Sequence, residues 1–114
     1  MTALDLVAFD VVVVPFPFTD RQSSKKRPAL VLSSASFNRS TRHSVLAMIT
    51  SAEQSSWPGD VPISDLDVAG LPSGCLVRLK LFTLDHRLIV KRVGKLAAKD
   101  RDELAARWKT LVFQ

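Results

Sequence analysis

The run of four valines between Asp10 and Pro15 limits most strongly what this chain can fold into. Residues 10–16 read Asp-Val-Val-Val-Val-Pro-Phe, so both faces of an extended strand here are apolar and must be covered. Pro15 and Pro17 then end the run, because proline has no N–H for a neighbouring strand. The sequence therefore predicts a buried strand over residues 10–16.

Further segments have the composition of short strands, with β-branched and aliphatic residues bounded by turn-forming residues. They cover residues 29–33, 44–50, 60–63, 76–82 and 88–96. Pro62 favours a sheet edge for 60–63. The connecting residues 20–26, 64–74 and 83–85 are expected to be loops or turns, and 33–38 a turn or one helical turn.

Residues 100–112 have helical periodicity, with Leu104, Trp108 and Leu111 on one stripe and acidic residues in the first turns. We expect this stripe, Trp108 included, to pack on the sheet. Five or six short strands and a terminal helix predict a mainly β fold, a small and strongly curved barrel capped by the helix. A length of 114 residues suits a single domain over 1–114.

The positive charge is unevenly distributed. The net charge is +5, and no acidic residue lies between Asp20 and Glu53. A field of one sign attracts a polyanion such as nucleic acid; the alternative is that these cations only solvate a surface. The window contains six cationic residues, Arg21, Lys25, Lys26, Arg27, Arg39 and Arg42.

Several classes of protein are disfavoured. Cys75 is the only cysteine, which excludes an internal disulfide and a multi-cysteine zinc site and suits a small buried side chain. No run is long enough to span a bilayer, and the apolar run 6–18 contains Asp10 and two prolines and lacks the basic residues of a signal peptide. We therefore expect a cytoplasmic protein without a membrane role.

Nor do the titratable residues predict a metal centre. The acidic residues are scattered along the sequence, whereas two-metal nucleases need several acids at one site. His43 and His86 lie far apart in sequence. A surface position is the more common one for such a histidine, and His43 as a general base is the less favoured alternative.

With these residues in order, the chain resembles the PemK/MazF family of toxin endoribonucleases from bacterial toxin–antitoxin pairs, over essentially its whole length. The Arg-Pro step into an apolar strand, followed later by a Thr-Ser strand exit, is moderately specific. The matching segments are residues 10–16, 27–33, 49–51, 83–85 and 94–96, the last leading into the helix.

The resemblance implies an SH3-like barrel of the PemK/MazF/CcdB type that forms a homodimer, cleaves single-stranded RNA without a metal or cofactor, and is silenced by a cognate antitoxin. It assigns the cleavage site to Arg27, Thr50 and Ser51. The chain departs from the family in having Phe9 where glycine is usual. It also has Lys80, not an acid, two positions after Arg78, so the general base stays unassigned.

These residues also suit the chemistry when taken alone. RNA is cleaved when its 2′-OH attacks the adjacent phosphorus, and a guanidinium offers a planar, charged fork to the phosphorane oxygens. Arg27 has that group, and the hydroxyl of Thr50 or Ser51 can donate a hydrogen bond. For Arg27 the alternative is a structural salt bridge with Asp20 or Asp85.

Further residues are candidates for binding RNA. Lys25 and Lys26, in the predicted loop, would attract phosphate. Arg78 and Lys80 would lie on the solvent-exposed face of the predicted strand 76–82. Trp57 would stack on a base or, equally, fold back as a lid over the core or the dimer interface. Two other functions stay open, a toxin that blocks a protein target as the gyrase poison CcdB does, and a catalytically weak RNA binder.

Overall fold

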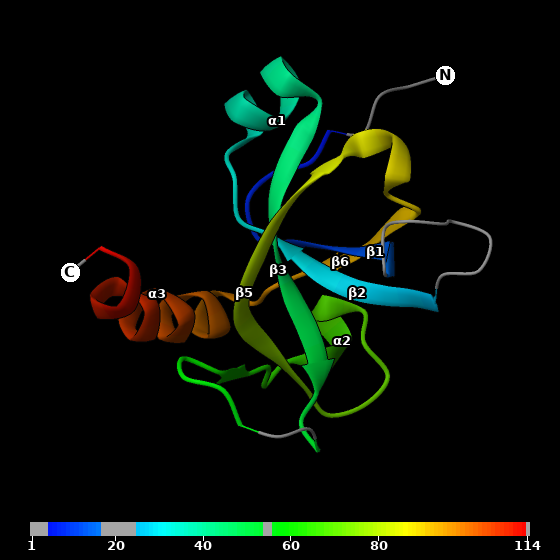
Figure 1. Ribbon diagram of the computed structural model, residues 1–114. Helices are drawn as coiled ribbons and strands as arrows, with labels where there is room; N and C mark the ends of the chain where they lie inside the picture. Colours follow the sequence, from blue (N-terminus) through cyan, green and yellow to red (C-terminus); the bar gives the residue numbers. More distant parts are fainter. Residues whose placement is uncertain (1–4, 17–24, 54–55, 114) are drawn as a thin grey trace.

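Six strands form one curled antiparallel sheet in the order β4-β5-β3-β2-β1-β6 (Figure 1). The structure, a computed structural model, describes residues 5–16, 25–53 and 56–113. This arrangement confirms the predicted mainly β fold with a C-terminal helix. The strands are β1 Asp10–Phe16, β2 Lys25–Val31, β3 His43–Ser51, β4 Val61–Pro62, β5 Cys75–Asp85 and β6 Lys91–Lys95; the helices are α1 Ala35–Thr41, α2 Leu66–Ala69 and α3 Ala98–Val112, with a 3₁₀ turn at His86–Leu88.

Strand β2 begins earlier than predicted. Lys25 and Lys26 belong to the strand, paired with Phe16 and Pro15 of β1, and not to a loop. Pro15 and Pro28 therefore lie inside strands, which proline usually avoids. Each stands where its strand has a partner on one side only, because β6 pairs with β1 only up to Val13 and β3 pairs with β2 only from Ala29. The missing N–H therefore costs little there.

Strand β5 is longer than predicted. Thr83-Leu84-Asp85 continue β5 opposite His43–Val45 of β3, so the predicted turn at 83–85 is wrong, and the chain reverses instead through the 3₁₀ turn before β6. The register of β3 and β5 shifts between Ala47 and Met48. This irregularity lets a strand as long as β5 bend with the curled sheet. The predicted connection 64–74 also contains the short helix α2.

The sheet packs apolar side chains on both faces, as the valine run requires. Val11 of β1 and Leu30 of β2 join one buried cluster with Ala69 of α2 and Leu104 and Trp108 of α3. The other face of the same two strands contributes to a second cluster with the N-terminal segment and the far end of β5. Its members are Leu6, Val12, Val14, Ala29, Val31, Leu46, Leu84 and Ile89.

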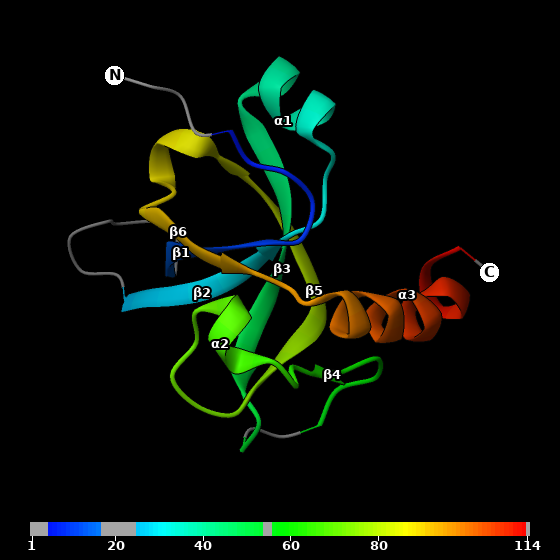
Figure 2. The ribbon, with the colours of Figure 1, turned by 180° about the vertical axis from the view of Figure 1, so that it is seen from behind.

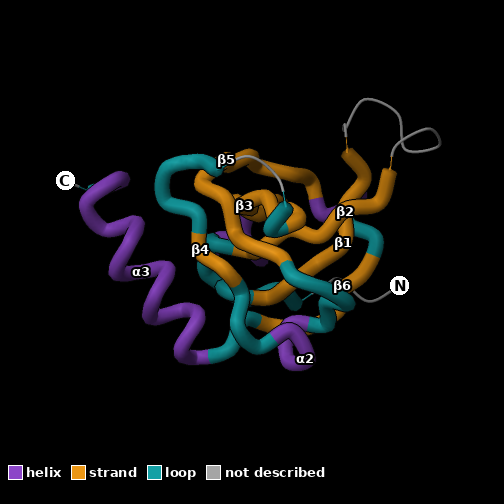
Figure 3. Tube along the Cα trace, turned by 90° about the horizontal axis from the view of Figure 1, so that it is seen from below, coloured by secondary structure: helices purple, strands orange, loops and turns teal. Residues whose placement is uncertain are grey.

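Helix α3 lies along the outside of the curled sheet beside β4 (Figure 3), with Leu104 and Trp108 turned inward. The buried carboxylate of Asp100 near its start accepts hydrogen bonds from Ser64 and from the backbone N–H of Asp65. Burial opposes ionisation of Asp100, yet these donors lower its pKa on balance. Among the described residues, no helix combines the length and apolar character of a membrane span.

Helix α2 fits against β6 only because glycine is present (Figure 2). A Cβ built on Gly94 of β6 would lie 2.5 Å from backbone atoms of Ala69. A Cβ on Gly70, which has φ +74°, would lie 2.1 Å from the carbonyl oxygen of Val93. Backbone atoms cannot yield as a flexible side chain can, so both sites require glycine.

We predict that Gly94→Ala lowers the free energy of unfolding by about 1–3 kcal/mol, because the added methyl group forces α2 away from β6. Urea denaturation followed by circular dichroism measures this change. Gly74→Ala is the matched control, since its Cβ would lie 3.9 Å from the Ala52 side chain, an ordinary contact distance. Equal stability of the two variants would contradict the close approach.

Candidate functional site

The registers of β2, β3 and β5 place several predicted site residues on one face of the sheet. Ala29 pairs with Met48, and Met48 pairs with Arg78. Side chains alternate along a strand, so Arg27 and Thr50, each two positions beyond that pair, share its face. This face, formed by Phe16, Arg27, Met48, Thr50 and Arg78, is called the Arg27 face below.

Arg27 is exposed at the beginning of β2, opposite Val14 of β1. Its guanidinium carbon lies 6.0 Å from the centre of the Phe16 ring, a cation–π contact that orients the side chain. Among the described residues, no carboxylate pairs with Arg27. The alternative salt bridge with Asp85 is wrong, because that carboxylate binds Arg87; Asp20 lies outside the described residues.

Lys25 and Lys26 are both exposed, but they point to opposite faces of β2. Lys25 pairs with Phe16 and, by alternation, shares the Arg27 face. Lys26 pairs with Pro15 and lies on the other face. Of the two, Lys25 is therefore the one whose charge adds to that of Arg27.

Thr50 and Ser51 end β3, and the structure separates them. Thr50 is half-buried on the Arg27 face, whereas Ser51 is exposed on the other face, where its hydroxyl accepts a hydrogen bond from the Glu53 N–H at 3.2 Å. Beyond Ala29 and Met48 the strands β2 and β3 diverge (Figure 1), so Arg27 and Thr50 lie on the two sides of that divergence.

Arg78 lies on the same face, but a carboxylate that sequence reasoning missed already binds it. Its Nε and Nη2 donate to the two oxygens of Asp60, at 3.1 and 3.0 Å. Both side chains are largely buried, at 12% and 14% exposure. These hydrogen bonds raise the pKa of Arg78. The carboxylate that Arg78 meets therefore belongs to Asp60, the residue directly before β4, and not to β5 itself.

Trp57 and Lys80, two of the predicted RNA-binding residues, are brought together. The Lys80 ammonium lies 5.0 Å from the centre of the Trp57 ring, and the indole N–H donates to the carbonyl oxygen of Leu79 at 3.2 Å. The Trp57 side chain remains 42% exposed. It is thus a fixed surface aromatic and not a lid over the core.

A family model for the PemK-like, MazF-like toxins of type II toxin–antitoxin systems matches residues 8–112. The chain belongs to this family. The match extends from the residues just before β1 to the end of α3 and so includes the whole Arg27 face. No curated protein matches the sequence.

Solved structures confirm the fold. MazF from Deinococcus radiodurans is similar with a TM-score of 0.73 and 24% identity, over 97% of this chain and 99% of that one. A MazE–MazF complex from the same organism gives a TM-score of 0.76 and 23% identity, with coverages of 97% and 99%. A mycobacterial endoribonuclease in complex with its cognate antitoxin gives 0.73 and 18%, with coverages of 99% and 96%.

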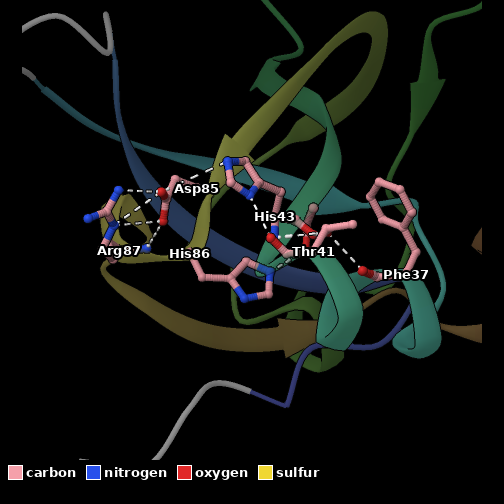
Figure 4. A network of polar contacts seen from close by, with 7 residues as sticks. Phe37, Thr41, His43, Asp85, His86 and Arg87 are labelled. Atoms are coloured by element: carbon pink, nitrogen blue, oxygen red, sulfur yellow. Dashed lines mark hydrogen bonds and ion pairs between the residues drawn. The ribbon is translucent and has the colours of Figure 1, made fainter.

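The histidines lie at the other end of β3 from Thr50, in the polar network of Figure 4. His43 faces Asp85 across the ladder, with its Nε2 3.9 Å from the carboxylate, which also binds Arg87 at 2.7 Å. Hydrogen bonds from Arg87 lower the pKa of Asp85 to about 2. His43, the less favoured candidate base, is therefore not beside Arg27.

His86 is linked to this network through the buried Ser44. Its Nε2 lies 2.8 Å from the Ser44 hydroxyl. Burial lowers the pKa of His86, and the nearby charge of His43 lowers it further. Among the described residues, no three His, Cys, Asp or Glu side chains gather as possible ligands of one metal ion.

We predict that the protein loses stability as the pH falls through about 6.5, the ordinary histidine value that His86 regains on unfolding. Below that pH the unfolded state binds more protons than the folded state, so protonation favours unfolding. Thermal melts between pH 8 and 5 measure this decline, and His86→Gln should reduce it.

His43→Gln is the control for the same experiment. It also removes one histidine but leaves the partial burial of His86 in place, and this burial is the larger cause of the lowered His86 pKa. This variant should keep most of the decline. A decline that is unchanged in His86→Gln would contradict the assignment.

Proposed function

We propose that this MazF-like toxin is a metal-independent endoribonuclease that cleaves single-stranded RNA, with Arg27 as the catalytic cation. The observation that carries the proposal is an exposed guanidinium, oriented by Phe16 and without a carboxylate partner among the described residues. Such a group is available to phosphate. Family membership supports the same reading, as does the endoribonuclease named in the mycobacterial complex.

The proposed reaction uses the RNA's own 2′-OH. The 2′-OH gives up its proton as its oxygen attacks the adjacent phosphorus. The bond from phosphorus to the 5′-oxygen breaks, this oxygen takes up a proton and leaves as a 5′-OH, and a 2′,3′-cyclic phosphate remains; the groups that exchange these two protons are unassigned. Arg27 would bind the phosphorane oxygens, where negative charge accumulates in the transition state. The Thr50 hydroxyl, on the same face, would donate a hydrogen bond to a phosphoryl oxygen, and Ser51 at the strand end would hold the neighbouring backbone.

Lys25, Lys26, Arg78 and Lys80 are the proposed RNA-binding cations, with Trp57 as an aromatic platform. Lys25 would contribute most to the phosphate path because it shares the face of Arg27. Arg78 would act mainly through its partner Asp60, which already binds two of its nitrogens.

We also propose a cognate antitoxin as partner, a homodimer as the assembled form and the cytoplasm as location. The antitoxin proposal is supported by the complexes of similar toxins with MazE and with a cognate antitoxin. A basic, phosphate-binding surface is readily blocked by an acidic segment that folds on binding.

We predict that the purified protein cleaves single-stranded RNA in the presence of EDTA and that Arg27→Ala lowers the rate roughly 100-fold or more, the usual cost of removing a donor to a transition-state oxyanion. Arg27→Lys should restore part of the rate, since it keeps the charge and loses the fork. Gel analysis of a labelled RNA, with identification of the cyclic phosphate, measures both.

Arg39→Ala is the control, because it removes an exposed arginine from α1, away from the Arg27 face. It should cleave at the original rate. Full activity of Arg27→Ala would refute the site, and a strict requirement for Mg²⁺ would refute the mechanism. A protein that neither cleaves nor binds RNA, yet blocks a protein target, would favour the alternative function.

Lysines 25 and 26 allow a second test within one strand. We predict that Lys25→Ala lowers the slope of log K against log salt by about 0.7, the value for one phosphate contact on a single strand. Lys26→Ala has the same charge change on the opposite face and should lower the slope less. Fluorescence anisotropy with a non-cleavable RNA measures both slopes, and the reverse order would contradict the assigned faces.

A further inference from the structure

The turn Trp57-Pro58-Gly59-Asp60 is built more firmly than a connecting loop requires. The Asp60 N–H donates to the Trp57 carbonyl at 3.1 Å, and Gly59 has φ +84°, which together with Pro58 gives a tight Pro-Gly turn. Asp60 ends the turn and stands directly before the two-residue edge strand β4. An acidic side chain in such a place is usually exposed, yet that of Asp60 is largely buried.

The Asp60 carboxylate accepts three hydrogen bonds from two segments, the turn itself and β5. One oxygen accepts from Arg78 Nε, and the other accepts from Arg78 Nη2 and from the backbone N–H of Trp57, all at 3.0–3.1 Å. Asp60 therefore ties the turn to β5. Because both oxygens are occupied by donors, it is suited to hold neighbouring groups and not to accept a proton from RNA.

Helix α3 holds the same turn from behind. Arg107 donates to the Asp60 carbonyl oxygen at 2.6 Å, and the buried indole of Trp108 donates to the Gly59 carbonyl oxygen at 2.7 Å. The backbone of the turn is thus fixed from the helix side, and its carboxylate is fixed from the sheet side.

These contacts leave the Trp57 ring oriented and half-exposed. Its N–H edge is bonded to Leu79, one face meets the Lys80 ammonium, and 42% of the side chain is open to solvent. Aromatic rings held in this way beside cations bind the bases of single-stranded nucleic acid by stacking, with little loss of side-chain freedom.

We infer that Asp60 is a positioning residue for RNA, which holds Arg78 and the Trp57 turn so that the Trp57 ring forms a stacking platform for one base. This inference rests on the proposed function. Asp60 would touch no RNA itself and would act through Trp57. The substrate class is single-stranded RNA, with one unpaired base stacked on Trp57.

The variant Asp60→Asn separates this positioning role from a simple effect of charge, because the two predict opposite changes in RNA affinity. Removing an acid from a basic protein should tighten RNA binding. Loss of the positioning contact should instead weaken it, about tenfold if one stacking interaction is lost. The control is Asp67→Asn, an exposed acid in α2 with the same charge change.

The experiment measures binding of a 2′-O-methyl RNA, which cannot be cleaved, by fluorescence anisotropy, and stacking by quenching of tryptophan fluorescence. We expect weaker binding and less quenching for Asp60→Asn, and no such loss for Asp67→Asn. Trp57→Leu identifies the Trp57 signal, because the only other tryptophan, Trp108, is buried. When Trp57→Leu is already present, adding Asp60→Asn should cause no further loss of RNA affinity.

Equal or tighter binding by Asp60→Asn overturns the inference, as does a full further loss in the Trp57→Leu background. Should Asp60→Asn fail to fold, Asp60→Glu keeps a carboxylate for Arg78 in altered geometry and should weaken binding in part; unchanged binding by this variant also overturns the inference. Failure of the proposed function appears instead in the unaltered protein, as absence of cleavage. An unaltered protein that does not bind RNA refutes both.

Discussion

The short ladder between β2 and β3 is the constraint on which the candidate site depends. Three residue pairs, Ala29–Met48 to Val31–Leu46, join these strands, whereas β2 pairs with β1 from Lys25 to Leu30. Because β3 leaves before Pro28, the proline is accommodated and Arg27 has no strand on that side. A longer ladder would cover the rim of the sheet and place the guanidinium against a neighbouring backbone.

The parts of the fold that could be predicted are those determined by residues close together in the sequence. The valine run of β1 and the apolar stripe of α3 follow from the periodicity of a few residues, and both elements were predicted within a few residues of their bounds. Of the predicted stripe, Leu104 and Trp108 are buried, whereas Leu111 near the end of the helix is 51% exposed. The errors lie where pairing with a strand distant in the sequence decides the secondary structure. Lys25 and Lys26 look like a loop but pair with β1, and Asp85 looks like a turn but pairs with His43.

The same distinction applies to the site. The faces of Arg27 and Thr50 follow from strand alternation, once the strands are assigned. Asp60 could not be found in this way, because it stands 18 residues before Arg78 and meets it only through the pairing of β4 with β5. The available signal was weak: an acid directly after a Trp-Pro-Gly turn and before an edge strand whose register was unknown.

Local pairing also decides where the net charge of +5 acts. Four arginines, at positions 78, 87, 92 and 107, are paired with carboxylates, Arg107 with Glu103 of its own helix. Pairing cancels most of the electrostatic field that these arginines would exert at a distance. Lys25, Lys26 and Arg27 have no such partner among the described residues, and they are consecutive. Similar charges on one short strand repel one another, a cost that an approaching phosphate backbone removes. If RNA binds as proposed, its phosphates would relieve this repulsion most where they lie along β2.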